Sequence, residues 1–281
     1  MSLSRKLIHL ASTAALGGLA LTSPISAFAQ TGDGPASEVA TQLPRGIVPS
    51  HYRIEATPDA ANLRFTANVV IDIAVSQPTS TITLNAADLS FTSATLTAAG
   101  KKKGVSGTVS LDAAAQTATI SFAQPIAPGN YSLGIAYAGV INTQANGLFA
   151  LDYQDGTGAQ KRALFTQFEA PDARRFVPSW DEPSYKATFD LSIVVPKGQM
   201  AVSNMPVLST KAGRKGASIV TFGTTPKMSS YLLFCGLGEL DRATTMAGAT
   251  EVGVVTGRGN TAKAQLALDA SKAILPWYND Y

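Results

Sequence analysis

The strongest constraint on the fold of this chain is a two-residue alternation of apolar and polar side chains that recurs along most of its length. In the run FTANVVIDIAV, residues 65–75, the apolar side chains fall on every second position: Phe65, Ala67, Val69, Ile71, Ile73 and Val75. Successive side chains of a β-strand point to opposite faces, so this run predicts a strand with one buried and one wet face. Comparable runs span residues 79–89, 107–111, 117–122, 131–140, 185–196, 218–223 and 230–240.

Turn sequences rich in proline and glycine separate these runs, for example at residues 127–130 and 196–198. Short strands at this spacing, joined by turns, are typical of two packed sheets. The sequence therefore predicts a mainly β fold, a saddle-like β-sandwich, over residues 43–242.

The chain changes character after about residue 242. Residues 251–259 predict one more strand, and residues 260–281 place apolar side chains at steps of three and four, as an amphipathic helix does. We interpret residues 243–281 as the incomplete beginning of a second domain, because the apolar stripe of this helix has no later element to pack on.

The limits of this helix are also predicted. Asn260 or Thr261 is the expected cap, because a short polar side chain can accept a hydrogen bond from a free N–H of the first turn. Pro276 is expected to kink the helix or to end its regular part, because proline lacks the N–H that continues the hydrogen-bond ladder.

Residues 1–29 have the three parts of a signal peptide. Arg5 and Lys6 give a basic start, a largely apolar stretch follows, and the triplet Ala-Phe-Ala ends at Ala29. We expect cleavage after Ala29, with a small, polar linker at residues 30–42. The apolar stretch is short and interrupted, which disfavours a permanent membrane anchor. The sequence thus predicts an exported protein of the periplasm, without membrane contact after cleavage.

Charge and metal-ligating residues exclude several classes of function. The 22 lysines and arginines balance 19 aspartates and glutamates, and no long basic run occurs, so nucleic acid is not an expected partner. The chain has two histidines and one cysteine. Only His51 lies beyond the predicted signal peptide, so no H-E-x-x-H, C-x-x-C or two-histidine site can be built. We expect this chain to bind no zinc through its own ligands.

Polar chemistry is concentrated in TQFEAPDARRFVPSWDEP, residues 166–183. This stretch falls within one of five segments that occur in a characteristic order: LPRGIVPSHYRIEATPD (43–59), LNAADL (84–89), TQFEAPDARRFVPSWDEPSYKATFDLSIVVP (166–196), AVSNMP (201–206) and PKMSSYLLFCGLGEL (226–240). Together they resemble the N-terminal β-domain of the aminopeptidase N family, the zinc aminopeptidases of the gluzincin class. The resemblance implies a β-saddle domain followed by a thermolysin-like α/β catalytic domain, of which residues 243–281 would be the first strand and helix.

The resemblance also implies a function. Members of this family remove N-terminal residues from peptides, using zinc held by an H-E-x-x-H helix together with a G-x-M-E-N motif. Neither motif occurs in residues 1–281. The zinc ligands are therefore expected beyond Tyr281, as are the catalytic and C-terminal domains that would be this domain's partners. By itself, the chain is expected to be inactive.

One substrate-binding position of the family maps onto this chain. In TQFEA, the family places an acidic or amide side chain that helps to hold the free α-amino group of the substrate. This position corresponds to Glu169, with Gln167 two residues earlier on the same strand face. The chemistry of the residue agrees, because a carboxylate forms strong charge-assisted hydrogen bonds to an ammonium group.

The other polar residues of this stretch are interpreted as structural. An arginine can clamp a carboxylate through two hydrogen bonds, so we expect an ion-pair network, with a tryptophan wedged against the sheet, to fix the loop. Its expected members are Asp172, Arg174, Arg175, Trp180, Asp181 and Glu182. A second hypothesis for the function remains open, a non-catalytic β-domain that binds peptides or a partner surface. The reading frame beyond codon 281 distinguishes the two.

Overall fold

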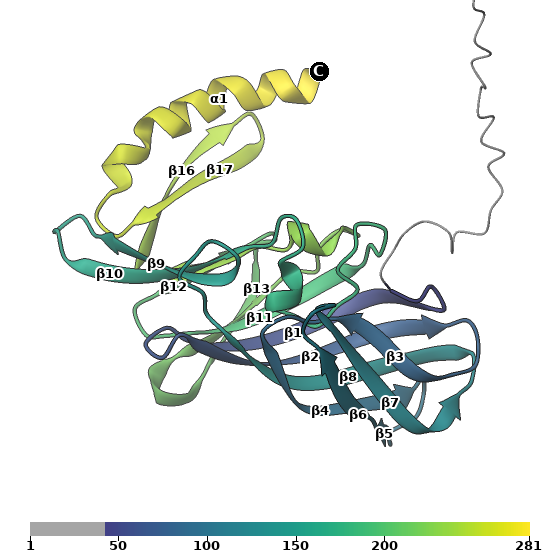
Figure 1. Ribbon diagram of the computed structural model, residues 1–281. Helices are drawn as coiled ribbons and strands as arrows, with labels where there is room; N and C mark the ends of the chain where they lie inside the picture. The colour runs from purple at the N-terminus through teal and green to yellow at the C-terminus, as the bar shows by residue number, and fades with distance from the viewer. Residues whose placement is uncertain (1–42) are drawn as a thin grey trace, which may run out of the picture. The chain divides into compact units, whose positions relative to one another are not determined.

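The computed structural model describes residues 43–281. The predicted signal peptide and linker lie outside these residues and stay predictions. The largest sheet has eight strands (Figure 1). In spatial order they are β13 (Val207–Ala212), β14 (Ser218–Phe222), β11 (Thr188–Val195), β1 (Ile47–Asp59), β2 (Arg64–Val75), β8 (Gly129–Val140), β4 (Leu89–Ala98) and β5 (Val105–Ser106).

Strand β2 shows why this sequence forms the sheet. Its alternating apolar residues are buried on one face, and Thr66 and Asn68 between them are exposed on the other. β2 pairs along its length with antiparallel β1 and β8. β1 also pairs in parallel with β11, so that His51 lies opposite Thr188. The strand predicted over residues 65–75 and the mainly β fold class are both confirmed.

A second sheet of three strands contributes to the same core. It consists of β3 (Thr79–Asn85), β7 (Thr117–Ile126) and β6 (Thr108–Asp112). Ile82 and Ile120 of this sheet belong to one buried cluster with Phe65 and Leu133 of the large sheet. Burying each such side chain contributes about 1.5 to 3 kcal/mol. The two sheets are therefore held together by a shared hydrophobic core, as expected of a sandwich.

A third sheet supports the candidate functional site. Its four strands are β12 (Met200–Ser203), β15 (Cys235–Gly238), β10 (Gln160–Gln167) and β9 (Gly147–Gln154). A Cβ atom at Gly238 would lie 2.7 Å from the Cβ of Ala163 in β10, and one at Gly236 would lie 2.8 Å from the ring of Phe165. Glycine at both positions therefore lets β15 lie close against β10.

One predicted strand is divided in the structure. Residues 230–240 form a 3-10 turn (Ser230–Leu232), then β15 and the first residue of β16. The physical reason lies in a side chain, because the Ser230 hydroxyl donates to the buried Asp181 carboxylate over 2.5 Å. The segment turns to satisfy that carboxylate before it enters the sheet.

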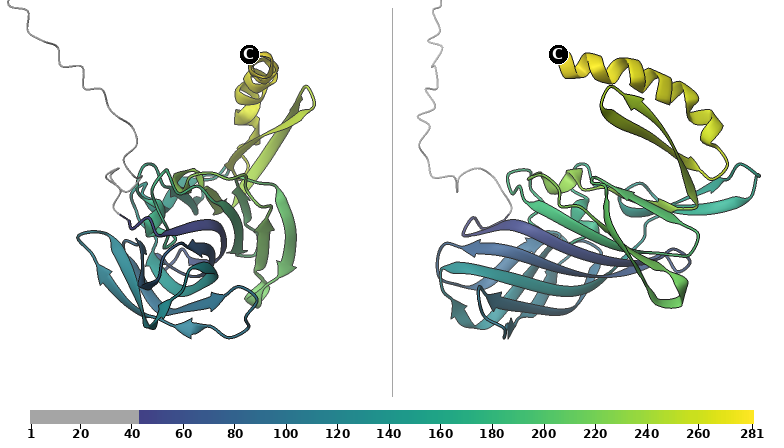
Figure 2. Two further views of the ribbon diagram at one scale, coloured as in Figure 1. Left: turned by 90° about the vertical axis from the view of Figure 1, so that its right-hand side faces the viewer. Right: turned by 180° about the vertical axis from the view of Figure 1, so that it is seen from behind.

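The last part of the chain is a hairpin and a helix (Figure 2). β16 (Leu240–Ala247) and β17 (Thr250–Gly257) form a two-stranded sheet, followed by a 3-10 turn (Thr261–Ala264) and α1 (Gln265–Asp280). The strand predicted over residues 251–259 is confirmed. The predicted domain boundary after residue 242 falls within β16 and stays a prediction.

The structure differs from two expectations about the ends of this helix. Neither Asn260 nor Thr261 caps it, because the 3-10 turn comes first and α1 starts after Ala264 without a side-chain cap. Pro276 does not end the helix, because α1 continues to Asp280, and the kink that was the other expected effect stays a prediction. Proline removes one N–H from the ladder, but the next turn still forms, with the Tyr281 N–H donating to the Trp277 carbonyl over 3.2 Å. Within residues 43–281, no helix has the length and apolar character to cross a membrane.

Candidate functional site

The candidate site is the turn that follows β10. Gln167 is the last residue of β10 and is exposed, Phe168 is buried, and Glu169 is exposed in the turn. Phe168 stacks on Phe176 with ring centroids 5.6 Å apart. The Asp172 N–H closes the turn by donating to the Phe168 carbonyl over 3.0 Å. Phe168 thus anchors a turn on which Gln167 and Glu169 are both open to solvent.

Glu169 is placed by this turn and not by the strand. β10 ends two residues before it, so the shared strand face predicted for Gln167 and Glu169 does not extend that far, although both side chains are exposed. The Glu169–Ala170 peptide bond is cis. Among residues 43–281, no hydrogen bond or ion pair involves the Glu169 carboxylate. Both of its oxygens are therefore available to a donor outside the described chain.

Arg175 ties the turn to the neighbouring part of the sandwich. Its Nε donates to Asp172 Oδ1 over 2.8 Å, and its Nη1 bonds the carboxylate of Asp88, between β3 and β4. Burial would lower the pKa of Arg175, but the hydrogen bond with Asp172 and the charge of Asp88 outweigh it and raise that pKa. Gly147, with φ +63°, makes room for this contact, because a Cβ there would lie 2.8 Å from the Arg175 Cβ.

Asp181 is the centre of a second, more deeply buried set of contacts. Its carboxylate accepts from Arg174 Nε over 3.0 Å and from the Ser230 hydroxyl over 2.5 Å. Arg174 also donates to Gln116 Oε1 over 3.3 Å, and the Asp181 N–H donates to Asn85 Oδ1 over 3.0 Å. The side chains of Arg174 and Asp181 are only 13% and 1% exposed. A buried ion pair with such supporting hydrogen bonds is costly to break.

Trp180 and Glu182 make separate contacts. The Trp180 side chain is buried, and its backbone N–H donates to the Tyr52 hydroxyl over 3.2 Å. Burial raises the pKa of Tyr52 well above its usual range. Glu182 Oε1 accepts from the Leu43 N–H over 3.0 Å. The residues predicted to form one network are therefore divided. Asp172 bonds Arg175, Asp181 bonds Arg174, and Trp180 and Glu182 make contacts elsewhere.

Several residues that complete these sets are not among the sequence predictions. They are Asn85, Asp88, Gln116 and Ser230. The available signal was the resemblance, because Asn85 and Asp88 lie in the segment LNAADL and Ser230 lies in PKMSSYLLFCGLGEL. Local alternation in those segments does not indicate that they face the loop of residues 168–187.

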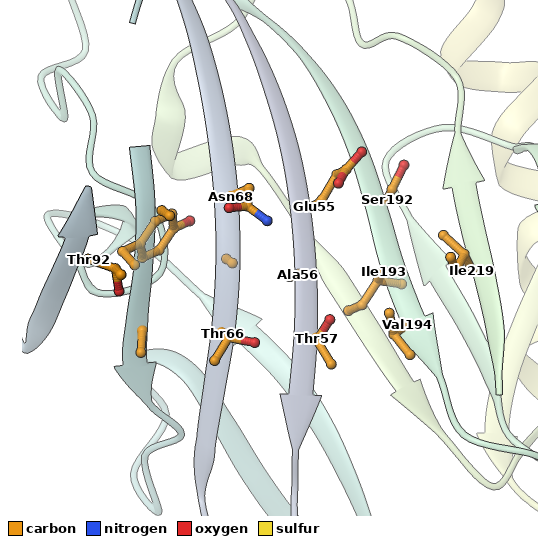
Figure 3. Close-up of a pocket in the computed structure, with 14 residues that line it drawn as sticks. Glu55, Ala56, Thr57, Thr66, Asn68, Thr92, Ser192, Ile193, Val194 and Ile219 are labelled. Atoms are coloured by element: carbon orange, nitrogen blue, oxygen red, sulfur yellow. The ribbon is translucent and has the colours of Figure 1, made fainter. Parts of the chain in front are cut away.

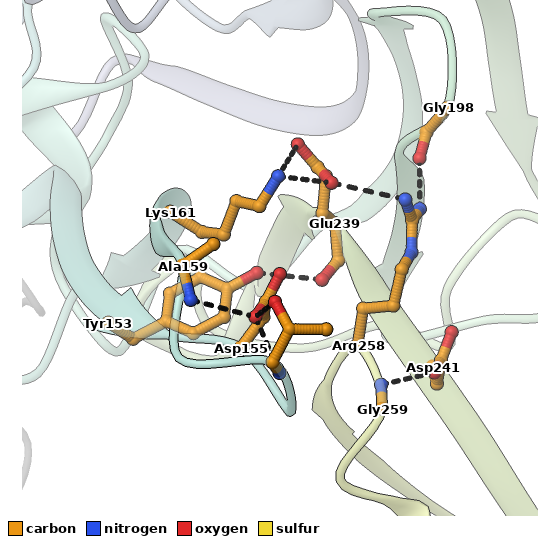
Figure 4. A network of polar contacts seen from close by, with 10 residues as sticks. Tyr153, Asp155, Ala159, Lys161, Gly198, Glu239, Asp241, Arg258 and Gly259 are labelled. Carbon is orange, nitrogen blue, oxygen red and sulfur yellow. Dashed lines mark hydrogen bonds and ion pairs between the residues drawn. The ribbon is translucent and has the colours of Figure 1, made fainter.

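A further polar network joins the β9–β10 hairpin to the residues on either side of the β16–β17 hairpin (Figure 4). The Glu239 carboxylate accepts from Lys161 Nζ over 3.0 Å and from Arg258 Nη1 over 3.1 Å. Arg258 also bonds the Gly198 carbonyl, and the Tyr153 hydroxyl donates to the Glu239 carbonyl over 2.7 Å. Burial and the nearby Glu239 charge raise the pKa of Tyr153. This network fastens the β9–β10 hairpin to the β16–β17 hairpin.

The described residues do not fit a zinc site. His51 Nδ1 lies 2.7 Å from Thr188 Oγ1, and its Nε2 lies 3.2 Å from Asp190 Oδ2, so this side chain is engaged on the sheet. Cys235 is buried, which raises the pKa of its thiol to about 12 and keeps it neutral. In residues 43–281, no three His, Cys, Asp or Glu side chains are grouped to hold a metal ion.

Comparison with known families places the chain among the N-terminal domains of peptidases. The family described as the Peptidase M1 N-terminal domain matches residues 48–232. Because this match covers more than half of the chain, the chain belongs to the Peptidase M1 N-terminal domain family. The resemblance to the aminopeptidase N family is confirmed.

Related proteins share this region. The chain is 39% identical to Aminopeptidase N of Acetobacter pasteurianus over 277 residues, 99% of this chain and 75% of that protein. It is 33% identical to the Puromycin-sensitive aminopeptidase of Caenorhabditis elegans over 259 residues, 90% of this chain and 27% of that protein. Endoplasmic reticulum aminopeptidase 1 of Rattus norvegicus is 31% identical over 245 residues, 85% of this chain and 26% of that protein. The chain thus spans about a quarter of the length of these animal relatives.

Proposed function

We propose that this chain is the N-terminal portion of an exported, zinc-dependent aminopeptidase and that Glu169 binds the free α-amino group of its peptide substrate. The observation that carries the proposal is the state of Glu169, a carboxylate that is exposed and unpaired within residues 43–281 on a well-anchored turn. Membership of the peptidase family and the names of the relatives support the reaction class.

The chemistry of the proposed contact is simple. An exopeptidase must distinguish a charged N-terminus from an interior amide, and a carboxylate does so through charge-assisted hydrogen bonds worth roughly 1.5 to 3 kcal/mol. Gln167, two residues earlier and also exposed, offers an amide oxygen as a second acceptor. The buried Phe168 between them fixes the backbone from which both side chains extend, so little backbone entropy is lost when the substrate binds.

Zinc remains part of the proposal only for the complete enzyme. Because residues 43–281 contain no fitting ligand set, we assign to them the binding and orientation of the substrate and no step at the metal. Export rests on residues 1–29 alone. Mass spectrometry of the product recovered from the periplasm should show a mature N-terminus at Gln30, and an uncleaved form held in the membrane would contradict export.

The test of Glu169 compares variants of the complete enzyme on aminoacyl-nitroanilides. Glu169→Ala should lower kcat/KM about ten- to hundredfold, because one charge-assisted contact to the ammonium is lost. Glu169→Gln should be milder, since an amide oxygen still accepts a hydrogen bond. The matched control is Glu251→Ala, an exposed glutamate paired with Arg242 on the β16–β17 hairpin, and it should leave kcat/KM unchanged.

The thermal midpoint, measured on the same preparations, separates this role from a structural one. Glu169→Ala should leave it nearly unchanged, because the carboxylate has no partner within the described chain. A clearly lowered midpoint with unchanged kcat/KM would sink the substrate role. If the complete protein binds peptides through Glu169 but hydrolyses none, the alternative of a non-catalytic peptide-binding domain takes its place.

A further inference from the structure

The solvent face of the eight-stranded sheet is divided into two chemically different halves. In one half the polar side chains bond one another. Arg53 clamps the Asp72 carboxylate over 2.8 and 2.7 Å, and the Ser132 hydroxyl donates to the same carboxylate over 2.7 Å. Hydrogen bonding by Arg53 holds the pKa of Asp72 below its usual range. The Asp190 carboxylate is likewise hydrogen-bonded, to His51 Nε2 and to the Thr224 hydroxyl. This half has little hydrogen-bonding capacity left for a ligand.

In the other half, the Ser192 hydroxyl pairs with that of Thr221 over 2.8 Å, but four polar side chains have no such partners. Glu55 lies opposite Asn68, and Thr57 lies opposite Thr66, in the register of β1 and β2. No hydrogen bond or ion pair connects any of these four side chains to residues 43–281. The side chains therefore form a two-by-two block on one sheet face, with a carboxylate, an amide and two hydroxyls left to bond water or a ligand (Figure 3).

The surface around this block is hollowed. A cavity of about 390 Å³ is lined by the four side chains and by their neighbours on the adjoining strands. On β8 these neighbours are Ala136, opposite Asn68, and Ala138, opposite Thr66, whose methyl groups leave space above the sheet. On the other side, Val194 and Ile219 contribute apolar surface. The hollow therefore combines a polar centre with apolar margins.

We propose that this hollow binds a neutral sugar ring. A sugar presents hydroxyls that both donate and accept, together with a face of C–H groups. Glu55 can only accept, Asn68 can do both, and the two threonine hydroxyls can do both. Ring hydroxyls could thus bond Glu55, Thr57 and Asn68, while the C–H face rests on Val194 of the adjoining strand β11. The volume lies within the range of small-molecule sites, about 300 to 1,000 Å³.

The same chemistry argues against other small ligands. An anion would be repelled by Glu55 and would find no arginine or lysine among the residues that line the cavity. A small cation could use the oxygens of all four polar side chains, but only one of them is a carboxylate, and the apolar margins would have no role. The proposal does not depend on the aminopeptidase function, because the hollow shares no residue with the turn that carries Glu169.

The test is a titration of the 281-residue chain with D-glucose and with N-acetylglucosamine, followed by NMR of the methyl groups of Val194 and Ile219. We expect saturable shifts of these signals with at least one sugar. Glu55→Ala and Asn68→Ala should each weaken the affinity roughly tenfold, because each removes hydrogen bonds to the ligand. Glu251→Ala, the same change at an exposed glutamate outside the hollow, should leave the affinity unchanged.

Three results would overturn the proposal. The first is the absence of any shift with both sugars, and the second is a shift that both variants leave unaltered. The third is a shift with ethylammonium but not with sugars, which would make the hollow a cation site. Misfolding does not blur these outcomes, because the four side chains are exposed and the remaining methyl signals of each variant report whether the core is intact.

Discussion

The two tryptophans of the chain lie in two regions that differ in the regularity of the backbone and in the burial of the side chains. Trp180 belongs to the loop of residues 168–187, which contains one short 3-10 turn and no strand, yet its side chain is only 1% exposed. Trp277 belongs to α1, a regular helix of the hairpin-helix group at residues 240–281, yet it is 60% exposed. Regular backbone hydrogen bonding and burial of side chains are therefore separate properties in this molecule.

The difference has a physical origin in where the polar groups find partners. In the loop, irregular backbone is buried because side chains from distant segments satisfy it, as when Asn85 accepts from the Asp181 N–H. In the hairpin-helix group, the backbone satisfies itself, and few side chains are needed. Its buried apolar residues are Leu240, Ala247, Ala264 and Leu268. The loop should thus contribute to global stability, and α1 should open at a lower free-energy cost.

The largest expected effect comes from the buried ion pair of the loop. Asp181→Ala should lower the free energy of unfolding by about 3 to 5 kcal/mol, because it leaves the largely buried Arg174 guanidinium without its carboxylate. The Ser230 hydroxyl and the Arg174 N–H would lose their acceptor as well. Urea denaturation, followed by the fluorescence of the tryptophans, measures this loss.

The matched control is Asp152→Ala. Asp152 also pairs with an arginine through two hydrogen bonds, Arg162 Nε over 2.7 Å and Nη2 over 2.8 Å, but its side chain is 59% exposed. Water replaces such a partner, so the expected loss is much smaller than the loss at Asp181. Equal losses for the two variants would mean that burial of the loop adds nothing to the strength of its ion pair.

How far the sequence predicts this structure depends on the range of the interactions. The alternation in residues 65–75 is a local pattern, and β2 forms where it predicts a strand. The apolar stripe of residues 260–281 is local too, and α1 forms within it. The predicted cap is wrong because a 3-10 turn precedes the helix, and the helix does not end at Pro276 because an exposed helix end can continue past a missing N–H.

Long-range partners were not predictable from local patterns. Ser230 meets Asp181 across 49 residues, and Asp88 meets Arg175 across 87. Nothing in the alternation of either segment indicates which distant side chain will face it, because that depends on sheet order. Glu169 was singled out by its motif and not by its surroundings. The structure adds that this carboxylate is exposed and unpaired among residues 43–281, and its binding role stays a proposal.

The smallest expected effect on stability is at the second tryptophan. Trp277 contacts its helix neighbours, with ring centroids 5.1 Å from Tyr278 and 5.6 Å from Tyr281. Trp277→Ala should therefore change the free energy of unfolding by less than about 0.5 kcal/mol, whereas the same substitution at the buried Trp180 should cost about 3 to 5 kcal/mol.

The larger effect of Trp277→Ala should be on self-association, which sedimentation of the 281-residue chain measures. The exposed aromatic groups of Trp277, Tyr278 and Tyr281 favour association of copies, and removing the largest of them should reduce it. A loss of stability at Trp277 close to that at Trp180 would show that α1 is packed as firmly as the loop, and the contrast between the two regions would fail.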